Sequence, residues 1–164
     1  MALLLTGCAT LAAYQAETAR WQAKADAATA SMGASQVTVV LGPGTTGGYH
    51  RAERQIVIGV ETGNKDWLLA HELSHHILGH TGITLEQEMA ANANAVTVLM
   101  VSGRTEPEAV YYVERVLLPI QRHGSTVTRD AHNWCAEYRD VVRRYAYLQE
   151  TGEGRELCPL TAAK

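Results

Sequence analysis

Two histidines and a glutamate in one short run have the residue types and the spacing to hold and use a metal ion. His71 and His75 are four residues apart, so on a helix they share a face and can direct two imidazole nitrogens at one ion. Glu72 lies about 100° round the helix from His71, where it can reach a water on that ion and take its proton. The pattern predicts two metal ligands and a general base.

The flanking residues predict that this run lies on a partly buried helix. The apolar residues 67–70 lead into it, and either Asn64 or Asp66 could cap its first turn. Gly79 suits its C-terminal end. The alternative interpretation is an amphipathic helix that carries histidines without binding a metal.

A third ligand is expected on the next helix, because catalytic zinc is held by three protein ligands and a water. Thr84 opens that helix with the spacing of a capping box, and Glu88 follows about one turn later. A helical hairpin would bring Glu88 to the height of His75. Asn92 shares the face of Glu88 and could hydrogen-bond a ligating imidazole, or it could be an ordinary surface residue.

Two motifs carry a resemblance to a known family, His71-Glu72-x-x-His75 and Glu88-x-x-Ala91-Asn92-x-x-Ala95-x-x-Val98-Leu99-Met100. They resemble the gluzincin-type zinc metallopeptidases, most of all the small ImmA/IrrE-type peptidases. The resemblance implies one Zn²⁺ per chain held by His71, His75 and Glu88. It also implies that a water hydrolyses a peptide or protein substrate, with Glu72 as the general base that activates this water.

The resemblance covers roughly residues 55–101, and the C-terminal third of the chain has no counterpart in it. Asn94 stands where an aromatic residue is usual, and Val101 stands where a proline is usual.

Peptide hydrolysis also needs an oxyanion donor and a place for the substrate. Candidate donors are Tyr111, Tyr112 and His123, each of which could equally be a packing or surface residue. The predicted strand 55–60 could offer its edge to an extended peptide. His76 and His80 are interpreted as surface groups or as hydrogen-bond partners of the ligands.

Length and charge narrow the class of protein. A chain of 164 residues is most simply one domain with a real core. A net charge of −3 without a basic patch argues against nucleic-acid binding. No apolar run approaches the ~18 residues that a membrane-spanning helix needs.

The first residues resemble a bacterial lipoprotein signal, with Leu5-Thr6-Gly7-Cys8 as its lipobox. This implies a lipid anchor on Cys8, a residual signal at 1–8, and one metallopeptidase domain at 9–164 on the periplasmic face of a membrane. Only seven residues precede Cys8 and none is Lys or Arg, so either the true start lies upstream or the match is accidental.

Cys135 and Cys158 remain as an even pair if Cys8 carries lipid. An oxidising compartment could join them in a disulfide, whereas a cytosolic protein would keep two reduced thiols.

The residue pattern predicts an α+β fold, in which a small antiparallel sheet packs on a zinc-binding helical hairpin with further C-terminal helices. Strands are expected at 36–41, 49–53 and 55–60, and helices at 11–31, 64–78, 84–101, 105–118 and 128–150. The helix 11–31 could pack on the domain or act as a tether. Pro119 is expected to disturb the fourth helix, and the tail 152–154 is expected to be flexible.

The leading hypothesis is a zinc endopeptidase of the bacterial cell envelope. The alternatives are a catalytically silent metal-binding or interaction module and a cytosolic regulatory peptidase that cleaves a repressor. Glu72 favours an enzyme, because a structural metal site needs no base.

Overall fold

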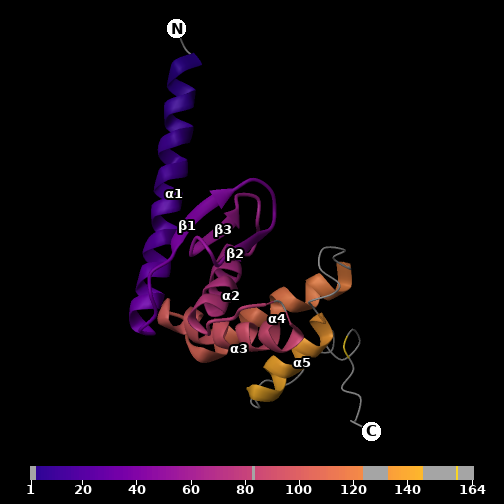
Figure 1. Cartoon of the computed structure of the whole chain (residues 1–164). Helices are drawn as coiled ribbons and strands as arrows, with labels where there is room; N and C mark the ends of the chain where they lie inside the picture. Colours follow the sequence, from indigo (N-terminus) through magenta and orange to yellow (C-terminus); the bar gives the residue numbers. More distant parts are fainter. Residues whose placement is uncertain (1–2, 83, 124–132, 146–157, 159–164) are drawn as a thin grey trace.

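The part of the chain that the computed structural model describes, residues 3–82, 84–123, 133–145 and 158, forms five helices and three strands (Figure 1). Side chains are described for 11–82, 84–117, 133–145 and 158. The elements in chain order are α1 (Leu3–Ser31), β1 (Thr38–Gly42), β2 (Gly47–His50), β3 (Gln55–Gly59), α2 (Lys65–Ile77), α3 (Leu85–Val101), α4 (Glu106–His123) and α5 (Trp134–Arg144). The predicted α+β class is confirmed.

The sheet has the strand order β1-β3-β2, so β3 is its central strand. β2 pairs with β3 antiparallel, as predicted, but β1 pairs with β3 parallel, with Val39 opposite Ile56 and Leu41 opposite Ile58. The sheet is therefore mixed, and the prediction of an antiparallel sheet is wrong for β1.

The loop between β1 and β2 explains this arrangement, because it crosses the end of β3. Backbone N–H groups of Val60 and Glu61 donate to the carbonyl oxygens of Gly42 and Gly44, each at 2.9 Å. A Cβ on Gly59 would lie only 2.4 Å from the Gly44 oxygen, so the loop can pass this closely only over a glycine. The crossing lets β3 insert between β1 and β2.

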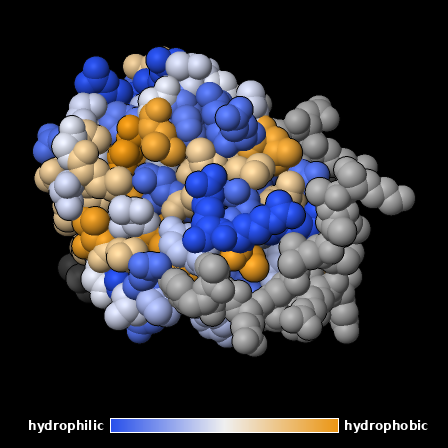
Figure 2. Space-filling model, turned by 90° about the horizontal axis from the view of Figure 1, so that it is seen from below, coloured by the Kyte–Doolittle hydropathy of each residue, from blue (hydrophilic) through white to orange (hydrophobic). Residues whose placement is uncertain are grey.

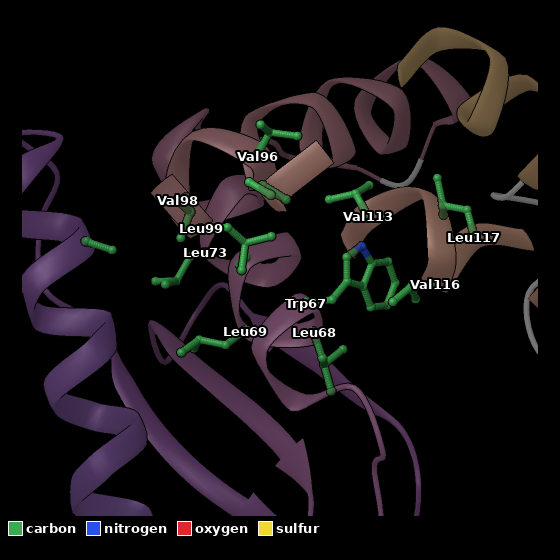
Figure 3. Close-up of a cluster of buried hydrophobic side chains, with 14 of the residues drawn as sticks. Trp67, Leu68, Leu69, Leu73, Val96, Val98, Leu99, Val113, Val116 and Leu117 are labelled. Atoms are coloured by element: carbon green, nitrogen blue, oxygen red, sulfur yellow. The ribbon is translucent and has the colours of Figure 1, made fainter. Parts of the chain in front are cut away.

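α2 lies at the centre of the core, in contact with the sheet and with α1, α3 and α4 (Figures 1 and 3). Trp67 lies against Val113 and Val116 of α4, and Leu73 lies beside Leu99 of α3 (Figure 3). These side chains are at most 7% exposed. Burying each contributes about 1.5–3 kcal/mol, so packing on all sides fixes the helix that carries His71 and His75.

α1 packs on the domain through its second half and projects past the sheet with its first half (Figure 1). Trp21, Ala25 and Ala28 are buried, so this half of the helix packs on the domain, the first of its two expected roles. Lys65 of α2 donates to the Glu17 carboxylate at 2.7 Å and ties the two helices together. Cys8 falls within α1, but its side chain lies outside those described. Its lipidation therefore stays a prediction.

The last two helices differ from their predicted bounds. α4 continues past Pro119 to His123. Burial of its apolar face, including Val110, Val113 and Leu117, against α3 and α5 offsets the ~3 kcal/mol that an internal proline costs. α5 begins after Asn133, whose side chain accepts from the Ala136 N–H at 3.0 Å, and ends at Arg144.

The predicted cap Thr128 and the tail 152–154 lie outside the described residues.

The surface on the side of α3 and α4 mixes apolar with polar residues and does not gather the apolar ones in one patch (Figure 2). Among the residues that the structure describes, no helix has the length and apolar character needed to cross a membrane.

Candidate metal centre

The structure brings together the three predicted ligands. His71 and His75 lie on α2, Glu88 lies in the first turn of α3, and their potential ligand atoms are all within 4.8 Å of one another. His71 is 4% exposed and Glu88 is 3% exposed. α2 and α3 pack on each other more extensively than any other pair of the described helices, and this hairpin brings the cluster together.

The donor atoms have the spacing that one metal ion requires. His71 Nε2 lies 3.1 Å from His75 Nε2 and 3.1 Å from Glu88 Oε2, and His75 Nε2 lies 3.4 Å from the same oxygen. Ligands around a tetrahedral ion with bonds of about 2.0–2.1 Å lie about 3.3 Å apart. This buried His/His/Glu group could therefore hold a metal ion.

A chain of hydrogen bonds sets the tautomer of His71. Asn92 Nδ2 donates to Glu137 Oε2 at 2.6 Å, which leaves Asn92 Oδ1 facing His71 Nδ1 at 3.1 Å. Because an amide oxygen only accepts, Nδ1 carries a proton in every protonation state, and in the neutral imidazole of His71 the lone pair therefore lies on Nε2, toward the other donors. Asn92 is therefore a buried hydrogen-bond partner of His71 and not a surface residue.

Sequence reasoning missed Glu137, which comes from α5 in the third of the chain that the resemblance does not cover. A signal was present in the sequence. Trp134, Tyr138 and Val141 form an apolar stripe, and Glu137 falls on it, where a surface glutamate would not. Glu137 is fully buried.

His80 supports the second histidine. Its Nδ1 lies 3.0 Å from Nδ1 of His75, and when His75 donates this hydrogen bond its own Nε2 carries the lone pair. The C-terminal cap of α2 directs His80 there. The Gly79 N–H donates to the His76 carbonyl at 3.1 Å, and the His80 N–H donates to the His75 carbonyl at 3.0 Å. Gly79 has φ +66°, the left-handed conformation that this cap requires.

The charges within the cluster stabilise one another. Burial alone would raise the pKa of Glu88, but hydrogen bonds from His71 and His75 hold that pKa far below its usual range. Burial alone would lower the pKa of His71, but Glu88 and the nearby Glu72 raise it above its usual value. The site therefore stabilises an ionised Glu88 carboxylate next to a positively charged group.

Glu72 and the three donors line one cavity of about 320 Å³. Tyr49 and Arg51 from β2 and its following turn close the side opposite α2, together with residues 80–82. The Glu72 carboxylate makes no hydrogen bond to any described residue and is partly exposed. It is therefore free to accept a proton from a group in the cavity.

Two of the three predicted oxyanion donors lie outside the metal cavity. Tyr111 is 49% exposed on α4, Tyr112 packs under Arg104, and neither lines the cavity. The side chain of His123 lies outside those described. Tyr49 does line the cavity, and its hydroxyl lies 2.7 Å from His76 Nδ1, while His76 Nε2 donates to the Ser35 carbonyl at 2.8 Å. His76 therefore orients Tyr49.

The sheet edge at the cavity also differs from the prediction. β3, at residues 55–59, is paired on both sides, so it has no edge to offer. Among the described strands, β2 has its second side unpaired, and β2 carries Gly48 and Tyr49 into the cavity lining. The sheet edge at the cavity is therefore that of β2 and not that of β3.

The structure also places the cysteine pair and Asn94. Cys135 and Cys158 have sulfurs 2.07 Å apart, at the length of a disulfide bond, as predicted. Asn94, at a position where the resemblance leads us to expect an aromatic residue, donates to Ser74 Oγ at 3.2 Å and so joins α3 to α2.

Comparison with known proteins adds no relative: no family model, no curated protein and no solved structure matches this chain.

Proposed function

We propose that this protein is a zinc-dependent endopeptidase. One observation carries the proposal: the unengaged carboxylate of Glu72 shares a cavity with three buried, converging donors. A purely structural metal site is closed by a fourth protein ligand and needs no base, whereas a catalytic site keeps an open position beside one.

The donor set supports zinc as the metal. Two imidazoles and one carboxylate form a common catalytic zinc set, and imidazole is a poor match for Mg²⁺ or Ca²⁺, which prefer oxygen ligands. The tetrahedral spacing of the donor atoms agrees with that choice.

The residues of the chain divide the work of hydrolysis. A bound zinc ion supplies Lewis acidity, which polarises a carbonyl and lowers the pKa of a water toward about 7. Glu72 accepts the proton of the attacking water and later gives it to the leaving nitrogen. Asn92 and His80 hold the two imidazoles in the tautomers that this needs.

A peptide is the substrate that the cavity suits best. The unpaired side of β2 can hydrogen-bond an extended chain along its main chain, next to Glu72 and the metal donors. The substrate needs no particular sequence for that pairing, since backbone groups make it.

We further propose that the protein works in an oxidising compartment, anchored by lipid on Cys8 to the periplasmic face of a bacterial membrane. The disulfide between Cys135 and Cys158 supports the compartment, and the lipobox-like start supports the anchor. Labelling of the native protein with a tagged fatty acid, with Cys8→Ser as control, tests the anchor. Unlabelled protein in a soluble fraction would favour the cytosolic alternative.

The proposed activity is tested with Glu72→Gln, using Glu86→Gln as a matched control. Purified protein should contain about one zinc per chain, and His71→Ala or His75→Ala should remove it. Glu72→Gln should keep the zinc and lose cleavage of a peptide library by at least about 10²-fold, because only the base is lost. Glu86 is exposed, so its variant should cleave normally.

Two outcomes would contradict the proposal. Unchanged turnover in Glu72→Gln would remove Glu72 as the base. Zinc binding by the unmodified protein without cleavage of any peptide in the library would favour the silent binding module.

A further inference from the structure

A second cavity, here called the basic pocket, opens beside the metal centre. It has a volume of about 380 Å³ and lies between the turn that follows β2 and the C-terminal end of α2. The side chains that matter for its chemistry are Tyr49, Arg51, Arg54, His75, His76 and His80. Tyr49, Arg51, His75 and His80 also line the metal cavity, so the two spaces adjoin.

The two arginines of this pocket have no anionic partner among the residues that the structure describes. Neither Arg51 nor Arg54 forms an ion pair or a side-chain hydrogen bond with any residue that the structure describes. No acidic residue is among those that line the basic pocket. Guanidinium groups are always charged at physiological pH, so the pocket carries uncompensated positive charge.

The surrounding groups let that charge act inside the cavity. Burial raises the pKa of Tyr49, and the nearby charges of Arg51 and Arg54 lower it in part. The last carbonyls of α2 would oppose an anion. The backbone carbonyl groups of Ser74, His75 and His76 already accept hydrogen bonds from the N–H groups of residues 78–80, so these carbonyl oxygens do not point at an anion in the pocket.

A peptide lying along β2 would pass this pocket. β2 ends at His50, and Tyr49 of the strand and Arg51 of the turn that follows it both line the metal cavity and the basic pocket. A side chain one or two residues from the bond at the metal would therefore lie next to Arg51.

We propose that the basic pocket binds a carboxylate of the substrate and so makes the protein selective for peptides that carry one near the cleaved bond. This rests on the proposed peptidase function. An aspartate or glutamate side chain and a free C-terminus present the same group to the arginines. Bidentate pairing with a guanidinium is the chemistry that recognises it.

The test measures peptide binding in a variant that lacks the proposed base, so that affinity is determined without cleavage. Zinc-loaded Glu72→Gln is titrated with fluorescent peptides that carry Glu or Gln at each position near the cleaved bond, each with a free or an amidated C-terminus. A charged hydrogen bond supports a roughly tenfold to hundredfold preference for the carboxylate form. The position and the end group that carry the preference distinguish a side chain from a chain end.

Further substitutions in the Glu72→Gln background test whether the two arginines of the basic pocket cause the preference for carboxylate peptides. Arg51→Gln or Arg54→Gln should bring the ratio of affinities for the acid and amide peptides down toward one. Arg115→Gln removes the same charge from an exposed site on α4, stacked on Tyr111, and should leave the ratio unchanged. Zinc content and the unfolding curve of each variant confirm that the fold is intact.

The results separate the two proposals. Equal affinity for acid and amide peptides, or a preference that survives both arginine substitutions, overturns the basic pocket even if the protein cleaves peptides. A preference that depends on Arg51 and Arg54 supports the pocket. The same preference in a protein whose unmodified form cleaves none of these peptides would refute the peptidase function and leave the pocket standing.

Discussion

His71 Nε2 points its lone pair at the metal position because of residues that never touch that position. Asn92 orients the imidazole, and Glu137 orients Asn92. Such outer partners typically account for 10- to 100-fold in metal affinity. The His75–His80 pair repeats the arrangement on the second ligand, so each imidazole has its own support.

Asn92→Ala should weaken zinc binding by roughly 10- to 100-fold, since His71 loses the group that fixes its tautomer. Asn94→Ala is the matched control, because Asn94 lies on the same helix but bonds to Ser74. Both variants should lose some stability. Chelator competition measures the zinc affinities, and equal losses in the two variants would show that Asn92 acts on the fold alone.

Comparing substitutions of Glu88 and Glu86 distinguishes an effect on metal binding from an effect on helix stability. Two positions are about 200° apart on a helix, and the structure buries Glu88 among the donors and leaves Glu86 exposed. Glu88→Ala should raise the dissociation constant for zinc by more than about a hundredfold, because a ligand is lost outright. Glu86→Ala should cost less than about 1 kcal/mol of stability through the helix dipole. The reverse order in a chelator titration would move the third ligand to Glu86.

The sequence could predict the ligands because they are local. His71, Glu72 and His75 lie in one helical turn, and a capping box locates Glu88 on the next helix. Glu137 and Tyr49 could not be placed this way, since they reach the site from α5 and β2 and only tertiary packing brings them in. The stripe that Glu137 interrupts was the one local sign of its burial.

At the level of elements, helix ends were easier to predict than strand neighbours. Thr84 caps α3 by accepting from the Gln87 N–H at 3.3 Å, and Glu108 accepts from the Thr105 N–H at 2.8 Å, as their patterns indicate. The parallel pairing of β1 with β3 has no comparable local signature. It depends on a loop crossing over Gly59, which is a contact between distant residues.

Gly79→Ala tests the cap that directs His80. Its Cβ would meet nothing within 4 Å, so the cost is purely that of a left-handed backbone, about 1–2 kcal/mol of unfolding free energy. Gly82→Ala is the control, since its nearest contact would be an ordinary 3.6 Å and its φ is not left-handed. Urea denaturation of both variants compares them. A Gly79 variant as stable as the Gly82 variant would show that the cap contributes little.

At the level of the whole molecule, the C-terminal third belongs to the site. α5 packs on α3 and α4, and the disulfide between Cys135 and Cys158 ties the start of α5, two residues before Glu137, to a later segment. The candidate metal centre of the hairpin thus includes a hydrogen-bond partner, Glu137, from a helix that the resemblance does not cover.

Loss of the disulfide should therefore affect stability and metal binding together. The chain-entropy model gives about 3 kcal/mol for a loop of 23 residues. The double variant Cys135→Ser, Cys158→Ser should unfold at lower urea and bind zinc less tightly than the oxidised protein. Reductant should lower both quantities in the unmodified protein and neither in the double variant. Unchanged zinc affinity after reduction would show that α5 holds Glu137 without the bond.

The dependence on Glu137 also sets an order of events during synthesis. A growing chain presents His71, Glu72, His75 and Glu88 well before Glu137 and Cys158 leave the ribosome. On the proposed function, such a chain has all three donors but binds zinc weakly, so it would gain peptidase activity only after its last segments have folded. Zinc affinity of ribosome-held chains halted before and after Cys158 would measure that delay, and equal affinities would show that no such delay exists.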